Sequence, residues 1–416
     1  MRPHIPRLAA CLVCIIALFW FIPSIYGRAM FSGRFQLSGL YSSTLKQFMI
    51  LESDANGIRY RDESGKEYTI RAAQQQMPFL YTHNVNKWGG FPLHIDGKTF
   101  TYEEAAKAVQ FSRLTPRTMM QRPLPLHLLL ESSPEGASLE LPTDMLRIDR
   151  NSLSFINCAT GALDVAKSER FTTALQETGA HFPILLASSN PTPLKSFDEG
   201  IFLVDARKKL FQLKIVKGSP VCRNTGITVP GVPWFLAIEE HERREFYGAV
   251  ATMDAAYLIL YSGKLQQIPA GDFAPYKNSL DMRFTALHHT FIKNSPGSGS
   301  SVLYTATNTN YDLVHKHEEP LPTAVYDRAL LVNQGLSLLT PLVLRQHLPT
   351  TPHVAFWLEI PSKAFAALGI AVMLLTQAVL CRRQRQYNPW DFLLITVGGL
   401  PGFIAVRLFG PIQRLG

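Results

Sequence analysis

The chain has 416 residues, a formal net charge of +9 at pH 7 and 46% hydrophobic residues. Its Lys and Arg residues are scattered and form no basic run with interleaved aromatic residues, which argues against a nucleic-acid partner. The apolar residues are concentrated at the two ends of the chain. The middle has the composition of a soluble globular protein that is long enough to bury a large core.

A membrane helix is predicted in residues 8–27, which contain no charged side chain. A run of this length crosses the roughly 30 Å hydrocarbon layer of a bilayer. Arg2 and Arg7 precede it, and Trp20 and Tyr26 lie toward its far end, where aromatic rings favour the membrane interface. A cleaved signal peptide is the alternative, but the apolar run exceeds the usual ~7–15 residues and no small-residue cleavage site follows it. We therefore expect an uncleaved anchor.

Two further membrane helices are predicted in residues 356–381 and 391–410, separated by a basic loop in residues 382–390. Pro389 lies in this loop and cannot continue the preceding helix. Asp391 follows it and suits the start of the next helix, because a carboxylate interacts favourably with the helix dipole there.

Glycines and a proline interrupt the last predicted helix, at Gly398-Gly399 and Pro401-Gly402. We interpret this helix as kinked, with small residues that let a neighbouring helix approach closely and with Arg407 reaching toward the surface. Contact with another membrane subunit is the alternative interpretation.

The basic residues that flank the membrane segments predict the orientation of the chain. Under the positive-inside rule, residues 1–7 and the loop 382–390 belong in the cytoplasm. Residues 28–355 then form an extracytoplasmic domain, and residues 411–416 an extracytoplasmic C-terminus. In a bacterium, these features predict a multi-pass protein of the inner membrane with a large periplasmic domain.

The middle of the chain is predicted to be mainly β, because short apolar runs alternate with Gly, Asn, Asp and Pro. Three hairpins are expected, with turns at Asn56-Gly57, Asp205–Lys208 and Ser262-Gly263. Their succession favours a propeller-like domain built from antiparallel hairpins. Helical insertions are expected at Tyr102–Ser112 and Asp164–Thr178.

Three of the five cysteines, Cys11, Cys14 and Cys381, lie in the predicted membrane segments. Cys158 and Cys222 remain outside them, and two cysteines in an oxidising compartment can form a stabilising disulfide. Two buried free thiols are the alternative.

Two motifs resemble functional signatures but lack a required residue. Asp96-Gly97-Lys98-Thr99 resembles the end of a phosphate-binding loop, yet Pro92 stands where that loop needs glycine, so we expect a hairpin turn. The charged segment Glu239–Glu245 resembles a zinc-protease helix but lacks the second histidine. We expect a solvated helix or turn there.

Three histidines are candidate metal ligands: His288, His315 and His317. On a strand, His315 and His317 point to the same face and can bind a transition metal together with a carboxylate. His288 and His289 are adjacent and point to opposite faces, so only one of them can join such a site. No third ligand is specified by spacing.

Three stretches carry a resemblance to a known family: Phe91–Ala105, Leu139–Asp149, and Lys195–Gly200 with the strand-rich run that follows it. Together they resemble a family of uncharacterised bacterial membrane proteins called domain of unknown function 4857 (DUF4857). Members of that family are typically encoded beside the ATPase and permease of an ABC-type transporter. The resemblance therefore implies an accessory membrane subunit, and it implies no site residues.

The expected function is a non-enzymatic accessory or sensing subunit of an ABC-type transport complex in the bacterial inner membrane. Its partners would be the permease and ATPase subunits, and no cofactor is expected. A membrane-tethered envelope enzyme, metal-dependent through the three histidines, is one alternative. A scaffold that binds an envelope glycan or protein is another.

Overall fold

The computed structural model describes residues 4–30, 35–54, 57–120, 125–295, 301–347, 355–384 and 387–410. The chain divides into two compact units. We call them the β unit, made of Gln36–Glu52 and Ile58–Pro320, and the helical unit, made of Met1–Phe35, Ser53–Gly57 and Leu321–Gly416.

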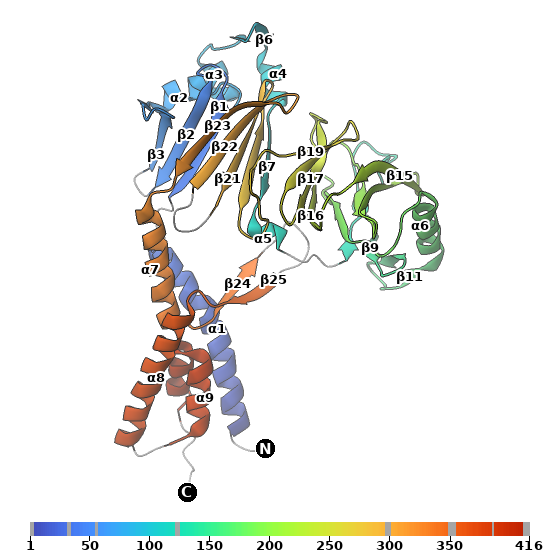
Figure 1. Cartoon of the computed structure of the whole chain (residues 1–416). Helices are drawn as coiled ribbons and strands as arrows, with labels where there is room; N and C mark the ends of the chain where they lie inside the picture. The colour runs from blue at the N-terminus through green and yellow to red at the C-terminus, as the bar shows by residue number, and fades with distance from the viewer. Residues whose placement is uncertain are drawn as a thin grey trace. The chain divides into compact units, whose positions relative to one another are not determined.

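The β unit contains a series of four-stranded sheets in which strands follow one another in chain order (Figure 1). The first sheet is formed by β1 (Gln36–Ser42), β2 (Gln47–Asp54), β3 (Gly57–Asp62) and β4 (Glu67–Tyr68). The second is formed by β8 (Leu126–His127), β9 (Asp144–Ile148), β10 (Leu153–Asn157) and β11 (Leu163–Asp164). The third is formed by β12 (Leu186–Ser189), β13 (Ile201–Val204), β14 (Lys209–Val216) and β15 (Ser219–Thr228). The fourth is formed by β16 (Pro233–Ile238), β17 (Phe246–Thr252), β18 (Ala256–Leu260) and β19 (Leu265–Gln267).

A five-stranded sheet completes this series. It contains β20 (Ser279–Phe284), β21 (His288–Asn294), β22 (Ser301–Asn308) and β23 (Leu313–Pro320), with β7 (Gln110–Leu114) beside β20. A short hairpin is formed by β5 (Leu93–Ile95) and β6 (Lys98–Phe100).

Mainly antiparallel sheets with helices are therefore confirmed for the β unit. Four-stranded meanders are the units from which propellers are built. Among the residues that the structure describes, however, these sheets form no closed ring.

The first sheet packs against the five-stranded sheet through aromatic side chains. The rings of Phe48 and Tyr304 lie 5.5 Å apart, and the Tyr41 backbone N–H donates to Thr290 Oγ1 at 3.1 Å. Gly39 is needed at this contact, because a Cβ atom there would lie 2.8 Å from the Met49 carbonyl oxygen and 3.0 Å from the Tyr304 ring.

Two predicted hairpins are confirmed in detail. β13 and β14 pair with Ile201 opposite Leu213, and Lys208 in their turn has a φ of 62°. β18 and β19 are joined by the predicted turn, where Gly263 has a φ of 80°. The strands of the third hairpin are β2 and β3, whereas Asn56 lies outside the described residues.

Packing between the third and fourth sheets forms one of the apolar cores of the β unit. Phe202, Val204 and Leu210 come from the third sheet, and Val250 and Ile259 from the fourth; all five are fully buried. Burial of each such side chain contributes about 1.5–3 kcal/mol, so this core ties the two sheets together.

Among its described residues, the β unit also carries five helices: α2 (Ile70–Gln76), α3 (Thr82–Lys87), α4 (Tyr102–Lys107), α5 (Pro116–Met119) and α6 (Val165–Glu177). The helix predicted at Tyr102–Ser112 is correct only in its first half. Thr101 and Glu104 form a capping box that starts α4, but Gln110–Leu114 pairs with β20 as a strand. α6 agrees with its prediction and is capped by Asp164.

The helical unit contains α1 (His4–Met30), α7 (Thr323–Leu339), α8 (Lys363–Gln384), α9 (Pro389–Gly398), α10 (Leu400–Leu408) and the hairpin β24 (Val343–His347)–β25 (Ala355–Glu359). By length and composition, two of its described helices, at Ile5–Met30 and Lys363–Gln384, are apolar enough to cross a membrane. They correspond to the first and second predicted membrane segments, but the second helix begins later than the predicted residue 356, because Ala355–Glu359 pairs with β24 as a strand.

The third predicted membrane helix, in residues 391–410, is wrong as a single crossing. The chain breaks at Gly399, whose combination of a φ of 57° with a ψ of −130° is readily adopted only by glycine. α9 and α10 then fold back on each other, since a Cβ atom at Gly402 would overlap the carbonyl oxygen of Leu394. In one continuous helix, these residues would be about 12 Å apart along the axis.

The two short helices thus form a hairpin that we call the α9–α10 hairpin. Arg7 contacts both of its ends, because its side chain reaches Asp391 at the start of α9 and the carbonyl oxygen of Gly410 just after α10. Both ends of the α9–α10 hairpin therefore lie at the end of the helical unit where α1 begins. The predicted extracytoplasmic C-terminus, residues 411–416, lies outside the described residues.

Candidate functional site

The loop between β16 and β17, Glu239–Glu245, connects several parts of the β unit. The sequence predicts a solvated helix or turn here, and the structure shows a turn whose side chains are mostly held by other elements. Glu239 accepts hydrogen bonds from Ser112 and Gln110 of β7. Burial raises the pKa of Glu239, and these two hydrogen bonds oppose that shift. The expectation of a solvated segment is therefore wrong for this carboxylate.

Glu240 lies in a buried ion-pair cluster with Lys195 and Asp198. Lys195 Nζ is 2.5 Å from Glu240 Oε2 and 2.5 Å from Asp198 Oδ1. The same amino group donates to the Asn190 carbonyl oxygen, and Ser132 donates to Asp198. All three charged side chains are at most 5% exposed. The positive charge of Lys195 and the negative charges of Asp198 and Glu240 therefore stabilise one another in the folded state.

Glu199, which follows Asp198 in the chain, extends this cluster. Its carboxylate lies 2.6 Å from Lys214 Nζ and accepts hydrogen bonds from Gln212 and Tyr261. Burial raises the pKa of Tyr261, and so does the negative charge of Glu199. The motif Lys195–Gly200 thus fixes the start of β13 to β14 and to the neighbouring sheet.

Glu245, at the far end of the loop, lies between the fourth sheet and the five-stranded sheet. His289 Nε2 is 3.0 Å from Glu245 Oε1, Tyr311 donates to the same oxygen, and Arg243 pairs with the other oxygen at 2.5 Å. Burial alone would raise the pKa of Glu245, but His289, Tyr311 and Arg243 outweigh it and lower the pKa to about 2. Glu245 is therefore held as a carboxylate.

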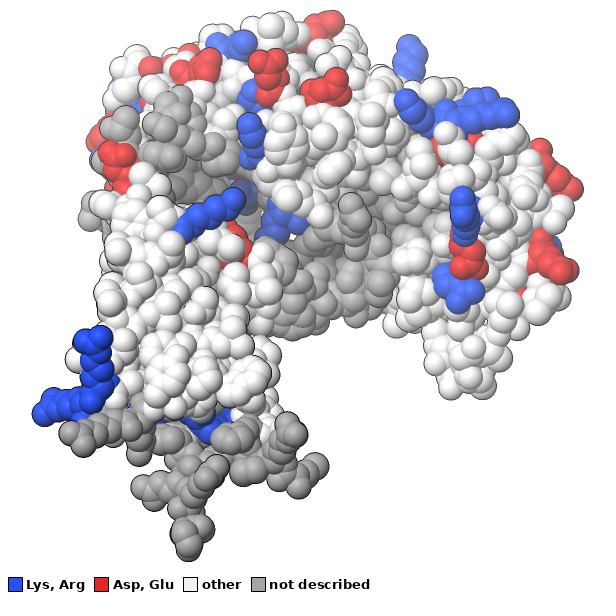
Figure 2. Space-filling view, turned by 60° about the horizontal axis from the view of Figure 1, so that its bottom comes forward, with Lys and Arg blue, Asp and Glu red and all other residues white. Residues whose placement is uncertain are grey.

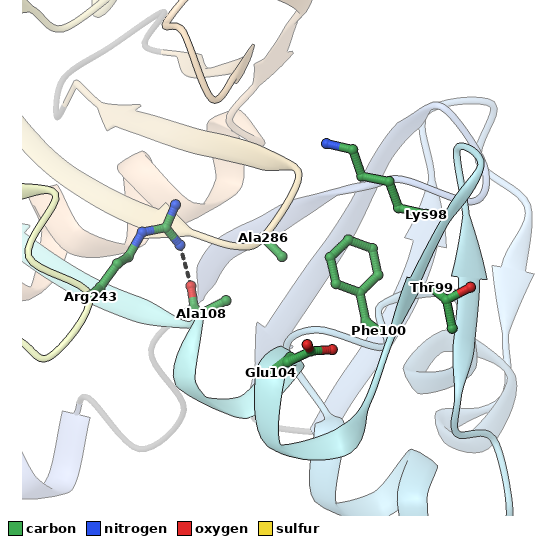
Figure 3. Close-up of a pocket in the computed structure, with 7 residues that line it drawn as sticks. All are labelled: Lys98, Thr99, Phe100, Glu104, Ala108, Arg243 and Ala286. Carbon is green, nitrogen blue, oxygen red and sulfur yellow. Dashed lines mark hydrogen bonds between the residues drawn. The ribbon is translucent and has the colours of Figure 1, made fainter.

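An open cavity of about 610 Å³ lies beside this loop (Figure 3). It is lined by Lys98, Thr99, Phe100, Glu104, Ala108, Arg243 and Ala286. Figure 3 shows the Phe100 ring in the middle of these residues, with Lys98 on one side and Glu104 on another. Arg243 forms part of the wall, where its guanidinium donates to the carbonyl oxygens of Ala108 and Thr285.

The lining of this cavity offers few polar groups. It offers one aromatic face, one amine and one carboxylate, which suits a small polar group or a peptide side chain. Arg243 is already paired with Glu245, and Glu104 accepts the backbone N–H of Thr101. Asp96-Gly97, just before Lys98, forms the predicted hairpin turn, with φ angles of 53° and 71°.

The structure brings two of the three candidate metal ligands to one carboxylate. His315 Nε2 lies 3.0 Å from each oxygen of Glu63, and His317 Nδ1 lies 3.7 Å from Glu63 Oε2. His288 instead forms a hydrogen bond with Ser43 at 2.9 Å. Its neighbour His289 faces Glu245, so the two adjacent side chains point to opposite faces as predicted. Among the described residues, no group of three or more His, Cys, Asp or Glu side chains is arranged to hold a metal ion.

Cys158 and Cys222 are both free thiols in the structure. Cys158 is exposed, whereas Cys222 lies partly buried on β15. Burial raises the pKa of the Cys222 thiol to about 11, with a smaller contribution from Glu177.

Sequence reasoning misses the buried clusters around Lys195 and Glu245. The bonded pair Lys195 and Glu240 is separated by 45 positions and the pair Glu245 and Tyr311 by 66 positions, so no local spacing reveals the clusters. One available signal is the density of acidic residues in Glu239–Glu245, since a charged loop between two buried strands often has partners within the fold.

Comparison with protein families shows that the model of a domain of unknown function, DUF4857, matches residues 38–303. The matched region is more than half of the chain. Comparisons with curated proteins and with solved structures give no significant match.

Proposed function

We propose that this chain, which belongs to the DUF4857 family, is a non-enzymatic accessory subunit of an ABC-type transport complex in the bacterial inner membrane. The proposal rests on the apolar helices of the helical unit. Two of its helices are long and apolar enough to cross a bilayer, and the α9–α10 hairpin packs on α1 through Cys11, Ile15 and Phe19. Such a unit suits a protein that works within a membrane assembly.

The surface of α8 offers a face for a partner helix. Leu368, Val372, Leu375 and Val379 are all exposed and are spaced four, three and four residues apart. This spacing places them along one stripe and is typical of a helix–helix seam. The side of the helical unit is mostly uncharged in Figure 2. We assign this stripe to contact with a permease helix.

The polar side chains of the β unit support a non-enzymatic role. Lys195, Glu240, Glu245 and Arg243 have the types of group that catalyse reactions, but each is bonded to another residue of the fold. These contacts hold sheets together.

The basic residues support the proposed orientation. Arg7, Arg382 and Arg383 belong to the same end of the helical unit as the ends of the α9–α10 hairpin, and the positive-inside rule assigns that end to the cytoplasm. The β unit would then lie in the periplasm, where it can sense or bind envelope components.

Site-specific photo-crosslinking tests this proposal. A photoreactive residue at Leu375 is expected to form a covalent adduct with a polytopic permease in intact membranes. Val13 on α1 is the matched control, because it is 68% exposed while Leu375 is 67% exposed, and it should give no such adduct. If both positions formed adducts with lipid and neither formed one with a protein, the proposed contact would be refuted.

A second candidate function is a scaffold that binds a glycan or peptide of the envelope. The cavity around Phe100 favours it, together with a propeller-like series of meanders that we propose as its frame. Purified full-length protein would bind an envelope glycan or peptide on an array, and Phe100→Ala would weaken that binding. Equal binding by both proteins would exclude this cavity.

A further inference from the structure

Basic side chains gather at one end of the helical unit. Arg7 lies in the first turns of α1, Arg382 and Arg383 lie in the last turn of α8, and Arg407 lies in the last turn of α10. Within the described parts of residues 4–10 and 381–410, Asp391 is the one carboxylate, and it pairs with Arg7 at 2.7 Å. Four positive charges and one negative charge leave a net charge of +3 there.

Arg407 differs from Arg7 because its contacts within this unit are to neutral groups. Its Nη2 donates to Gln377 Oε1 at 3.0 Å, and its Nη1 donates to Gln384 Oε1 at 3.2 Å. The guanidinium also lies 5.6 Å from the centre of the Phe403 ring. Its Nε is buried and has no hydrogen-bond partner. Amide oxygens hold the guanidinium in place but do not neutralise its charge, which is costly at the edge of a low-dielectric layer.

Two aromatic residues place this end of the unit at a membrane interface. Tyr387 is 74% exposed and Trp390 is 50% exposed, and both lie next to the start of α9. Such rings favour the level of the lipid headgroups. Figure 2 shows Lys and Arg side chains at the edge of the mostly uncharged surface of the helical unit. The basic cluster therefore lies at the depth where lipid phosphates are found.

From these observations we propose that Arg407, with Arg382 and Arg383, binds the phosphate of an anionic phospholipid. Basic pockets between membrane helices bind such headgroups. The guanidinium matches phosphate geometry and forms charge-assisted hydrogen bonds with it. Gln377 and Gln384 position the guanidinium between α8 and α10, so a bound lipid would link these two helices. This inference needs no partner subunit and does not depend on the proposed transport function.

The test is lipid retention by the full-length protein. Wild type, Arg407→Gln and Arg28→Gln are purified in mild detergent, and the lipids that remain bound are measured by mass spectrometry. Arg28 is the matched control, because it is an exposed arginine at the opposite end of α1. Wild type and Arg28→Gln should retain phosphatidylglycerol or cardiolipin, whereas Arg407→Gln should retain about tenfold less, the loss expected for one charge-assisted hydrogen bond.

Two titrations distinguish a lipid ligand from a free anion. Phosphatidylglycerol and inorganic phosphate are each titrated against the delipidated protein. Displacement of the lipid by inorganic phosphate at equal concentration would show that a free anion is the ligand. If Arg407→Gln does not fold, Arg382→Gln/Arg383→Gln replaces it, because both side chains are exposed. If the wild type and the variant retained equal amounts of anionic lipid, the proposal would be overturned. It would also be overturned if the wild type retained as much zwitterionic lipid as anionic lipid.

Discussion

Arg7 and Asp391 are 384 positions apart in the chain, and their side chains form an ion pair of 2.7 Å in which each is only 8% exposed. Arg7 also donates to the carbonyl oxygens of Phe409 and Gly410, where the helix of α10 has ended. One arginine thus neutralises the start of α9 and caps the end of α10. This contact closes the α9–α10 hairpin against α1.

Loss of this ion pair should destabilise the helical unit. Arg7→Gln leaves the buried Asp391 carboxylate without a counter-charge, and breaking such a pair costs about 3–5 kcal/mol. We expect a lower thermal unfolding midpoint for the full-length protein in detergent. The exchanged double variant Arg7→Asp/Asp391→Arg should recover part of the loss. An unchanged midpoint in Arg7→Gln would contradict this account.

Gly402→Ala should open the α9–α10 hairpin, because the added methyl group overlaps the backbone of Leu394 and Ile395. Overpacking of this kind costs about 1–3 kcal/mol. Gly27→Ala is the control, since nothing lies within 4 Å of a Cβ atom there, and alanine favours a helix. Thermal unfolding in detergent should show a lower midpoint for Gly402→Ala and an equal or higher one for Gly27→Ala. Equal losses in the two variants would argue against close packing at Gly402.

Lys195→Met should strongly destabilise the β unit. The variant leaves the Asp198 and Glu240 carboxylates buried beside each other without a cation, at a cost of about 3–5 kcal/mol. The exposed Lys264 provides a control, and Lys264→Met should change the free energy of unfolding by less than about 0.5 kcal/mol. Urea unfolding of the full-length protein measures both. If the two variants lost equal stability, the cluster would have no special role.

The stability contributed by Glu245 should depend on pH. Its pKa is lowered in the folded state from 4.5 to about 2. A lowered carboxyl pKa stabilises the fold above the unfolded value, and this contribution is lost as the pH falls through the folded value. The difference in unfolding free energy between wild type and Glu245→Gln should therefore be constant above pH 4.5 and shrink toward pH 2.

Tyr311→Phe provides the control for this titration. It removes one hydrogen bond to Glu245 but keeps the carboxyl group, so the pH dependence should remain with a smaller amplitude. Urea midpoints measured between pH 7 and about 2.5 test both variants. A difference between wild type and Glu245→Gln that does not change with pH would contradict the proposed state of this carboxylate.

The two cysteines of the β unit should differ in thiol reactivity. Only the thiolate reacts readily, and burial raises the pKa of Cys222 to about 11. Maleimide should therefore label the exposed Cys158 quickly at pH 7, and Cys222 slowly, in protein that has never been reduced. Labelling of both residues only after reduction would instead show that they form a disulfide.

The sequence predicts local features well. The hairpins at Asp205–Lys208 and Ser262-Gly263 are predictable because turn residues and flanking apolar strands lie within a few positions of each other. α6 is predictable for the same reason, since Asp164 caps its first turn.

Features that depend on distant residues are harder to predict. The interruption at Gly398-Gly399 is visible in the sequence, but a kink and a complete reversal have the same local signature. Arg7 distinguishes them, because it contacts both ends of the hairpin from the other end of the chain. The partners of Glu239 and Glu240 are likewise remote, which is why a solvated turn is the wrong expectation for these two residues.

We propose that this chain works as a subunit of a membrane transport complex. The most direct test is to purify the tagged full-length protein in mild detergent and to quantify every protein that elutes with it. If the proposal is right, an ATPase and a polytopic permease should elute in amounts comparable to the tagged chain. A protein that elutes alone from several mild detergents, with its helical unit still folded, would contradict it.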